Sequence, residues 1–149
     1  FQNGVGEQIH FVQDNQSFSS KGVLRGLHYQ TGNHAQAKLV RVLQGEVLDI
    51  AVDIRPESET FGQYEAVVLS EENQTQFYVP RGFAHGFLVL SETALFFYKC
   101  DNFYNKESEG GIIYNDATIG IDWSFPSSDL LISEKDTILP TLENAKKVW

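Results

Sequence analysis

Two histidines and a lysine carry side chains suited to acid–base or metal chemistry. His28 stands in the stretch Leu24–Gln30, Lys38 follows ten positions later, and His85 ends the segment Pro80–His85. An imidazole can transfer a proton near neutral pH or bind a metal ion, and a lysine supplies a positive charge. A lone histidine in a half-buried strand is more often structural, and a lone lysine is more often a solvated charge. The spacing of these residues must therefore distinguish a functional role from a structural one.

This spacing resembles the two halves of the cupin signature. In metal-binding cupins the first half supplies His-x-His and then a glutamate seven positions before a glycine, and the second half supplies another histidine. Here Gln30 stands at the second histidine and Lys38, seven positions before Gly45, at the glutamate. An ammonium at that place removes a ligand and repels a divalent cation. We therefore expect a pocket without metal, with His28 and His85 at its wall.

The elements that position these side chains are short apolar segments separated by turn residues. Such segments predict an all-β protein. The clearest strand covers residues 46–54, where the even positions from 48 to 54 are apolar and the odd positions are mixed. Residues 38–44 join it through Gly45, which predicts a tight hairpin. Further strands are expected at residues 9–13, 23–30, 62–69, 76–79, 85–90, 94–100 and 111–114. So many short strands are typical of a sandwich or barrel.

The last part of the chain has a different texture. After Trp123 it is loop-like, and a polar segment from Leu139 predicts one short helix. The apolar residues 130–132 are expected to pack across the barrel, which would bring Lys135 and Asp136 near its mouth. This tail is too small to form a domain of its own.

Composition narrows the function further. A chain of 149 residues with 42% hydrophobic content fits one domain over residues 1–149. The net charge of -9 offers no basic field for a nucleic acid polymer or an anionic membrane, so an anionic ligand needs local cations. No apolar run reaches the roughly 20 residues of a membrane span. The single cysteine, Cys100, lies in an apolar run and is expected to be a buried thiol, which fits the cytoplasm.

Blocks along nearly the whole chain resemble the dTDP-4-dehydrorhamnose 3,5-epimerase family, in family order. The blocks are residues 11–15, 22–30, 38–42, 45–47, 60–63, 80–90, 98–100, 121–123 and 131–136. The resemblance implies a metal-free, cofactor-free cupin-type jelly roll with a short C-terminal helical or loop tail, acting as a homodimer. It implies inversion of C3 and C5 of dTDP-4-dehydro-6-deoxy-D-glucose in dTDP-L-rhamnose biosynthesis.

The same resemblance implies the catalytic roles. His28 would be the general base and Asp136 the carboxylate that orients it, an arrangement also known from hydrolase triads. Lys38 would face the oxygen at C4, where its charge gains most as that oxygen becomes anionic. Tyr98 would reprotonate the opposite face of the enolate. Without the resemblance, Tyr98 is an ordinary core residue and Asp136 a surface loop residue.

Substrate binding is carried over onto a second set of residues. Arg25 and Lys135 would be cations for the diphosphate and Tyr104 an aromatic wall, while the polar contacts would come from Gln13, Asn15, Lys38, His85 and Glu109. Arg25 and His28 are three positions apart and would point to opposite faces of a regular strand. A bulge at Gly26 would turn both inward.

Family members carry an N-terminal nucleotide-binding segment before the place where this sequence begins. Either that segment is missing from this sequence or nucleotide affinity is weakened, and we expect the first. Three alternatives stay open. A mono-epimerase of C3 or C5 alone shares these motifs, a metal-dependent cupin enzyme would contain stoichiometric metal, and a catalytically inactive sugar-binding module would bind without proton exchange.

Overall fold

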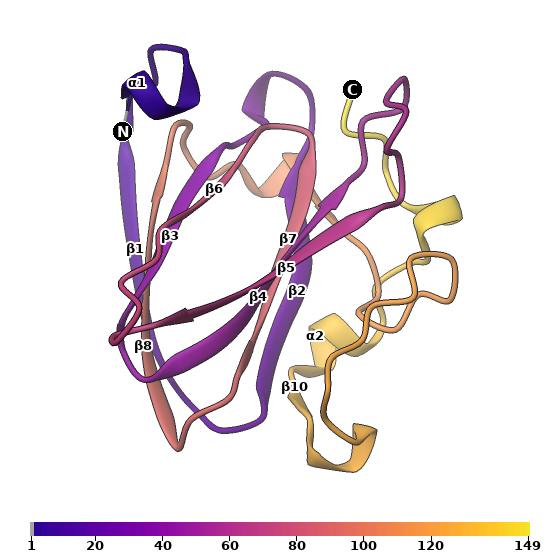
Figure 1. Cartoon of the computed structure of the whole chain (residues 1–149). Coiled ribbons are helices and arrows are strands. Elements are labelled where there is room, and N and C mark those ends of the chain that lie inside the picture. The colour runs from indigo at the N-terminus through magenta and orange to yellow at the C-terminus, as the bar shows by residue number, and fades with distance from the viewer. Residues whose placement is uncertain (1) are drawn as a thin grey trace.

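Two facing β-sheets form the framework of the computed structural model, which describes residues 2–149 and the side chains of residues 4–149 (Figure 1). The four-stranded sheet has the order β1 (Gln13–Ser20), β8 (Thr93–Cys100), β3 (Lys38–Gln44), β6 (Phe77–Val79). The six-stranded sheet has the order β10 (Leu131–Ile132), β2 (Val23–Gln30), β7 (Phe83–Val89), β4 (Glu46–Asp53), β5 (Tyr64–Ser70), and β9 (Glu109–Gly111) also pairs with β2. This confirms the all-β prediction, and the arrangement is consistent with a cupin-like jelly roll.

Each face of the six-stranded sheet buries a separate core. Between the sheets, a cluster of Val40, Val42, Val47, Leu69, Phe87, Val89, Ala94 and Phe96 fills one half of the interior. On the outer face of the sheet, the even residues of β4 (Leu48, Ile50 and Val52) pack with Ile54, Trp123 and Val148. The tail after β9 thus covers this outer face, as the orange and yellow segments in Figure 1 show. The odd positions of β4 consequently face the barrel interior.

The predicted hairpin at Gly45 was wrong. β3 belongs to the four-stranded sheet and β4 to the six-stranded sheet, so the chain passes from one sheet to the other at this glycine. Gly45 has φ +82°, and a Cβ there would lie 2.2 Å from the carbonyl oxygen of Thr93. Glycine is needed for this corner, which places β3 and β4 on opposite walls.

Two other strands differ from the sequence prediction. A strand was expected at residues 9–13, but the first strand is β1 (Gln13–Ser20), whose polar sequence gave no strand signal. It forms because each of its residues pairs with β8, and such pairing overrides intrinsic preference. The strand expected at residues 111–114 is β9, two residues earlier.

The helix expected from Leu139 is absent at that place in the described chain, where residues 142–144 form a single 3-10 turn. The short helices are α1 (Gln2–Val5) and α2 (Glu134–Thr137). Within residues 2–149, no helix has the length and apolar character needed to span a membrane.

Candidate active site

The polar half of the barrel interior is hollow. A cavity of about 330 Å³ is lined from the four-stranded sheet by Asn15, Lys38, Phe96 and Tyr98, and from the six-stranded sheet by Arg25, His28, His85 and Phe87. A second hollow of about 400 Å³ at the barrel mouth shares His28, Lys38 and Tyr98 and adds Tyr104, Glu109 and Lys135. Most of the residues singled out in the sequence therefore line one continuous region.

A β-bulge in β2 brings Arg25 and His28 to the same side. Arg25 pairs with Phe87 and His28 with His85, so three steps along β2 match two along β7. Gly26 lies in the bulge with φ +137°, and a Cβ there would lie 2.7 Å from the Cα of Gly86. Both side chains line the inner cavity, which confirms the bulge predicted at this glycine.

His28 forms a close pair with Asp136. His28 Nε2 lies 2.7 Å from Asp136 Oδ1, and the main-chain N–H of Gly26 donates to Oδ2 at 3.2 Å. The His28 side chain is 42% exposed, whereas that of Asp136 is 3% exposed. Burial alone would raise the pKa of Asp136, but the hydrogen bond and charge of His28 and the Gly26 amide lower it overall. An ionised Asp136 accepts only, so His28 Nε2 carries the proton and Nδ1 is left basic.

The tail supplies Asp136 through two short elements. β10 pairs in parallel with the start of β2, with Leu131 opposite Val23 and Ile132 opposite Leu24. Ser133 then caps α2 by accepting a hydrogen bond from the main-chain N–H of Asp136. This placement agrees with the expectation that the tail brings Asp136 to the barrel mouth, and it gives Asp136 a neighbour 108 positions away in sequence.

Lys38 and Tyr98 face the cavity from neighbouring strands of the four-stranded sheet. The ammonium of Lys38 lies 5.6 Å from the centroid of the Tyr98 ring, and among the described residues 2–149 it makes no hydrogen bond or ion pair. Burial lowers the pKa of Lys38, while Cys100 and Asp49 act in the opposite direction. Burial raises the pKa of Tyr98, which keeps the phenol protonated. Lys38 is thus a cation free to meet an anion, beside a phenol able to donate.

A second histidine–aspartate pair lies deeper and includes a residue that the sequence reasoning missed. His85 Nε2 lies 2.9 and 3.0 Å from the two carboxylate oxygens of Asp49. Both side chains are buried, and His85 stacks near Phe96. Burial raises the pKa of Asp49, although His85 and Lys38 oppose this. The available signal was an aspartate at an odd, inward position in the middle of β4, between apolar neighbours.

The nucleotide-contact candidates gather at the mouth. The Lys135 ammonium lies 3.7 Å from a Glu109 carboxylate oxygen, and the Tyr104 hydroxyl hydrogen-bonds to Glu109, which raises the pKa of that phenol. Asn15 lines the inner cavity. Gln13 lines neither of these two hollows, and its amide oxygen accepts the main-chain N–H of Tyr104 at 3.1 Å.

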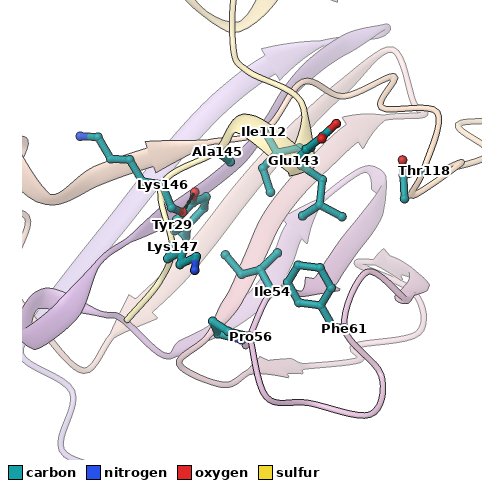
Figure 2. Close-up of a pocket in the computed structure, with 11 residues that line it drawn as sticks. Tyr29, Ile54, Pro56, Phe61, Ile112, Thr118, Glu143, Ala145, Lys146 and Lys147 are labelled. Carbon is teal, nitrogen blue, oxygen red and sulfur yellow. Dashed lines mark hydrogen bonds between the residues drawn. The ribbon is translucent and has the colours of Figure 1, made fainter.

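A third hollow of about 490 Å³ lies on the outer face of the six-stranded sheet. Figure 2 shows Ile54 and Phe61 facing the tail segment that contains Ala145. Its walls are mostly apolar, and the hydroxyl of Tyr29, one of the residues that line it, donates to the carbonyl of Lys146. No cluster of three His, Cys, Asp or Glu side chains arranged to hold a metal occurs among residues 2–149. The chemistry-bearing side chains thus lie inside the barrel.

Comparison with known proteins shows the family to which this chain is similar. Residues 1–144 match the family model described as dTDP-4-dehydrorhamnose 3,5-epimerase. The enzyme of that name from Salmonella typhimurium is 54% identical over 145 residues, which cover 97% of this chain and 79% of that protein.

Two solved structures are similar over almost the whole chain. A dTDP-4-dehydrorhamnose 3,5-epimerase from Elizabethkingia anophelis is 59% identical with a TM-score of 0.94, covering 99% of this chain and 80% of the other. A dTDP-6-deoxy-D-glucose-3,5-epimerase from Legionella pneumophila, solved in complex with dTDP-4-keto-L-rhamnose, is 52% identical with a TM-score of 0.92, covering 96% and 75%.

Proposed function

This chain belongs to the dTDP-4-dehydrorhamnose 3,5-epimerase family, and we propose that its barrel cavity inverts C3 and C5 of dTDP-4-dehydro-6-deoxy-D-glucose by proton transfer. It is an isomerase of dTDP-L-rhamnose biosynthesis. One observation carries the assignment of roles: His28 stands on the six-stranded sheet and Tyr98 on the four-stranded sheet, and both line the same cavity. A sugar ring held between them has a base on one face and a proton donor on the other.

The proton transfers follow from these positions. The hydrogens on C3 and C5 are acidic because they flank the C4 carbonyl. Nδ1 of His28 removes one of them, and the C–H electron pair becomes the enolate double bond while the carbonyl π electrons move to O4. Lys38 stabilises the O4 anion, which exists only after proton removal. Tyr98 then gives its proton to the carbon from the opposite face, and the configuration inverts.

Asp136 makes His28 a competent base. Its carboxylate accepts the proton on Nε2, which fixes the tautomer, and it stabilises the imidazolium that forms after abstraction. The Gly26 amide holds the other oxygen of the carboxylate. Asp136 is therefore a positioning residue that acts through His28.

We place the dTDP group at the barrel mouth. We assign Arg25, which lines the inner cavity, and Lys135, which lines the mouth, as cations for the diphosphate. Tyr104 offers an exposed ring to the nucleotide base. Such local charge is needed because the chain as a whole carries -9. Asn15, His85 and Glu109 are assigned as polar contacts to the substrate.

Hydrogen exchange in deuterated water tests this function. With the 4-keto substrate, the wild-type protein should incorporate one deuteron at C3 and one at C5, whereas a mono-epimerase incorporates one in total. His28→Ala should abolish exchange at both carbons. His10→Ala, which removes an exposed histidine outside the barrel, should exchange at the wild-type rate. Unchanged exchange in His28→Ala would remove His28 from the role of base.

We further propose that the enzyme is a cytoplasmic homodimer. The outer face of the four-stranded sheet bears Phe18, Leu39, Leu43, Leu95 and Phe97, and the Phe18 side chain is 64% exposed. An apolar sheet face of this kind is typical of subunit contacts. Cell fractionation tests the location.

A further inference from the structure

The side-chain amide of Gln30 binds two loops at once. Its Nε2 donates to the carbonyl of His34 at 2.8 Å and to that of Phe103 at 3.1 Å, and its Oε1 accepts the main-chain N–H of Asn105 at 2.8 Å. Gln30 is 5% exposed. Because both of its donors are already used, Gln30 has none left for a sugar hydroxyl unless it releases a loop.

Gln30 shares this task with Gln13 from the other sheet. Gln13 Oε1 accepts the main-chain N–H of Tyr104. Each of the three consecutive residues 103 to 105 therefore has one main-chain group hydrogen-bonded to the side-chain amide of Gln13 or Gln30. Such hydrogen bonds hold an irregular loop in one conformation at the end of β8.

The bound loop carries an aromatic ring that needs support. Tyr104 is 55% exposed, and its side chain has a hydrogen bond to Glu109. A ring this exposed gains little from packing in the free protein. Ordering such a ring only when ligand binds would reduce affinity, because conformational entropy is lost at that moment.

We propose that Gln30 is a positioning residue for nucleotide binding, which acts by holding residues 103–105 so that the Tyr104 ring is in place before the dTDP group arrives. This rests on the proposed function, in which Tyr104 contacts the nucleotide base. At the position where a metal-binding cupin has its second histidine, this chain has a side chain that anchors a loop.

Binding of dTDP measured by calorimetry, with kcat and KM for the 4-keto substrate, tests the proposal. Gln30→Met keeps the length of the side chain and removes all three hydrogen bonds. It should raise the Kd for dTDP and the KM about five- to tenfold and leave kcat within about twofold. In a Tyr104→Ala background the same change should have no further effect on the Kd, because the ring it positions is gone.

Asn73→Leu is the matched control. Asn73 also makes three side-chain hydrogen bonds to main-chain groups, those of Val68, Ser70 and Thr75, in a turn remote from the cavity. It should lower the melting temperature without changing the Kd for dTDP. If Gln30→Met does not fold, Gln30→Glu serves instead, since it keeps the acceptor for Asn105 and loses both donors.

Each outcome decides between explanations. An unchanged Kd in Gln30→Met or Gln30→Glu, a loss confined to kcat, or a full additional loss in the Tyr104→Ala background would overturn the positioning role. Failure of the wild-type protein to bind dTDP, or of Tyr104→Ala to weaken it, would instead contradict the proposed function.

Discussion

At the residue scale, the two histidine–aspartate pairs of the barrel differ in their access to a substrate. His28 is 42% exposed at its side chain, whereas His85 is 7% exposed and Asp49 is fully buried. A proton can therefore pass between His28 and a bound sugar, while His85 keeps Nε2 on Asp49. Placing the base on His28 follows from this difference in exposure as well as from family resemblance.

Asp136→Asn should lower kcat about 10²- to 10⁴-fold with little change in KM. The Gly26 amide requires an oxygen where Oδ2 lies, so the new amide nitrogen would face His28 Nε2 and donate to it. The imidazole proton then moves to Nδ1, which can no longer act as a base. Steady-state kinetics check this, and wild-type kcat in the variant would contradict the assignment of Nδ1.

Asp49→Asn should shift the alkaline limb of the kcat–pH profile to lower pH. Lys38 must be protonated to stabilise the enolate, so activity falls as pH rises through its pKa. Asp49 raises that pKa, and its loss lets burial lower the pKa further. Asp14→Asn, on the outer face of β1, is the control and should leave the limb in place. A limb that moves upward would rule out this coupling.

The site was predictable from sequence where chemistry and spacing coincide. His28, Lys38 and His85 have inward positions on strands whose ranges could be estimated, whereas Tyr98 was assigned by family resemblance. Asp49 was missed because the sequence does not show that its strand lies beside the strand of His85. Without that partner, an aspartate among apolar residues does not indicate a function. His28 and Asp136 are far apart in the sequence and meet only in the folded chain. The periodicity of the sequence cannot reveal such a contact.

At the scale of elements, the bulge in β2 sets the direction of two functional side chains. Gly26→Ala should destabilise the fold by several kcal/mol and remove activity, because its Cβ would lie 2.7 Å from the Cα of Gly86. Gly120→Ala also has positive φ, but its nearest neighbour is 3.8 Å away. That control should cost about 1 kcal/mol and keep activity. Chemical denaturation and hydrogen-exchange assays compare the stability and activity of the two variants. Equal losses in both variants would show that backbone strain alone is the cause.

The loop between β4 and β5 is organised by one carboxylate. Burial would raise the pKa of Asp53, but hydrogen bonds from Arg55, Ser58 and Thr60 lower it well below its usual range. The folded state thus binds its proton less readily than the unfolded state. Its stabilising contribution is present above the ordinary aspartate pKa of about 4 and is lost as pH falls through the folded value.

Asp53→Asn should therefore destabilise the protein at pH 7 by about 1–3 kcal/mol and flatten the loss of stability below pH 4. Urea unfolding at several pH values measures both effects. The network lies on the loop after β4, away from the catalytic cavity, so kcat of the folded variant should stay near wild type. If the stability of the variant falls below pH 4 as steeply as that of the wild type, other carboxylates dominate the acid dependence of stability.

Strands with clear apolar alternation were predictable, and those defined by pairing were not. The alternation over residues 46–54 correctly predicted β4 but did not show that both of its faces are buried. β1 has polar residues and exists through its register with β8. The corner at Gly45 has the sequence features of a hairpin turn. A corner and a hairpin can be distinguished only when the strands before and after the glycine have been placed in their sheets.

At the scale of the whole molecule, the two sheets bury one face each against one another, and the six-stranded sheet buries its other face under the tail. The outer face of the four-stranded sheet receives no such cover among residues 2–149. Composition predicted a single compact unit, but not which face would be left open, since that depends on where the tail folds.

Phe18→Asp should convert the proposed dimer into a monomer, because it places a charge at the most exposed apolar residue of the uncovered face. Light scattering across a concentration series measures the mass. Val68→Asp, an exposed apolar position on β5 of the other sheet, should leave the dimer intact. A wild-type protein that stays monomeric at all concentrations, or a dimer that tolerates Phe18→Asp, would exclude this face as the interface.

The docking of the tail on β2 also has a consequence for the order in which the enzyme becomes competent. His28 is synthesised before the tail, and its carboxylate partner follows 108 residues later. A nascent chain released up to the end of β9 already contains the barrel strands β1 to β8, together with Lys38 and Tyr98. It still lacks Asp136, so the proposed catalysis has to wait until the tail has been made and has docked on β2.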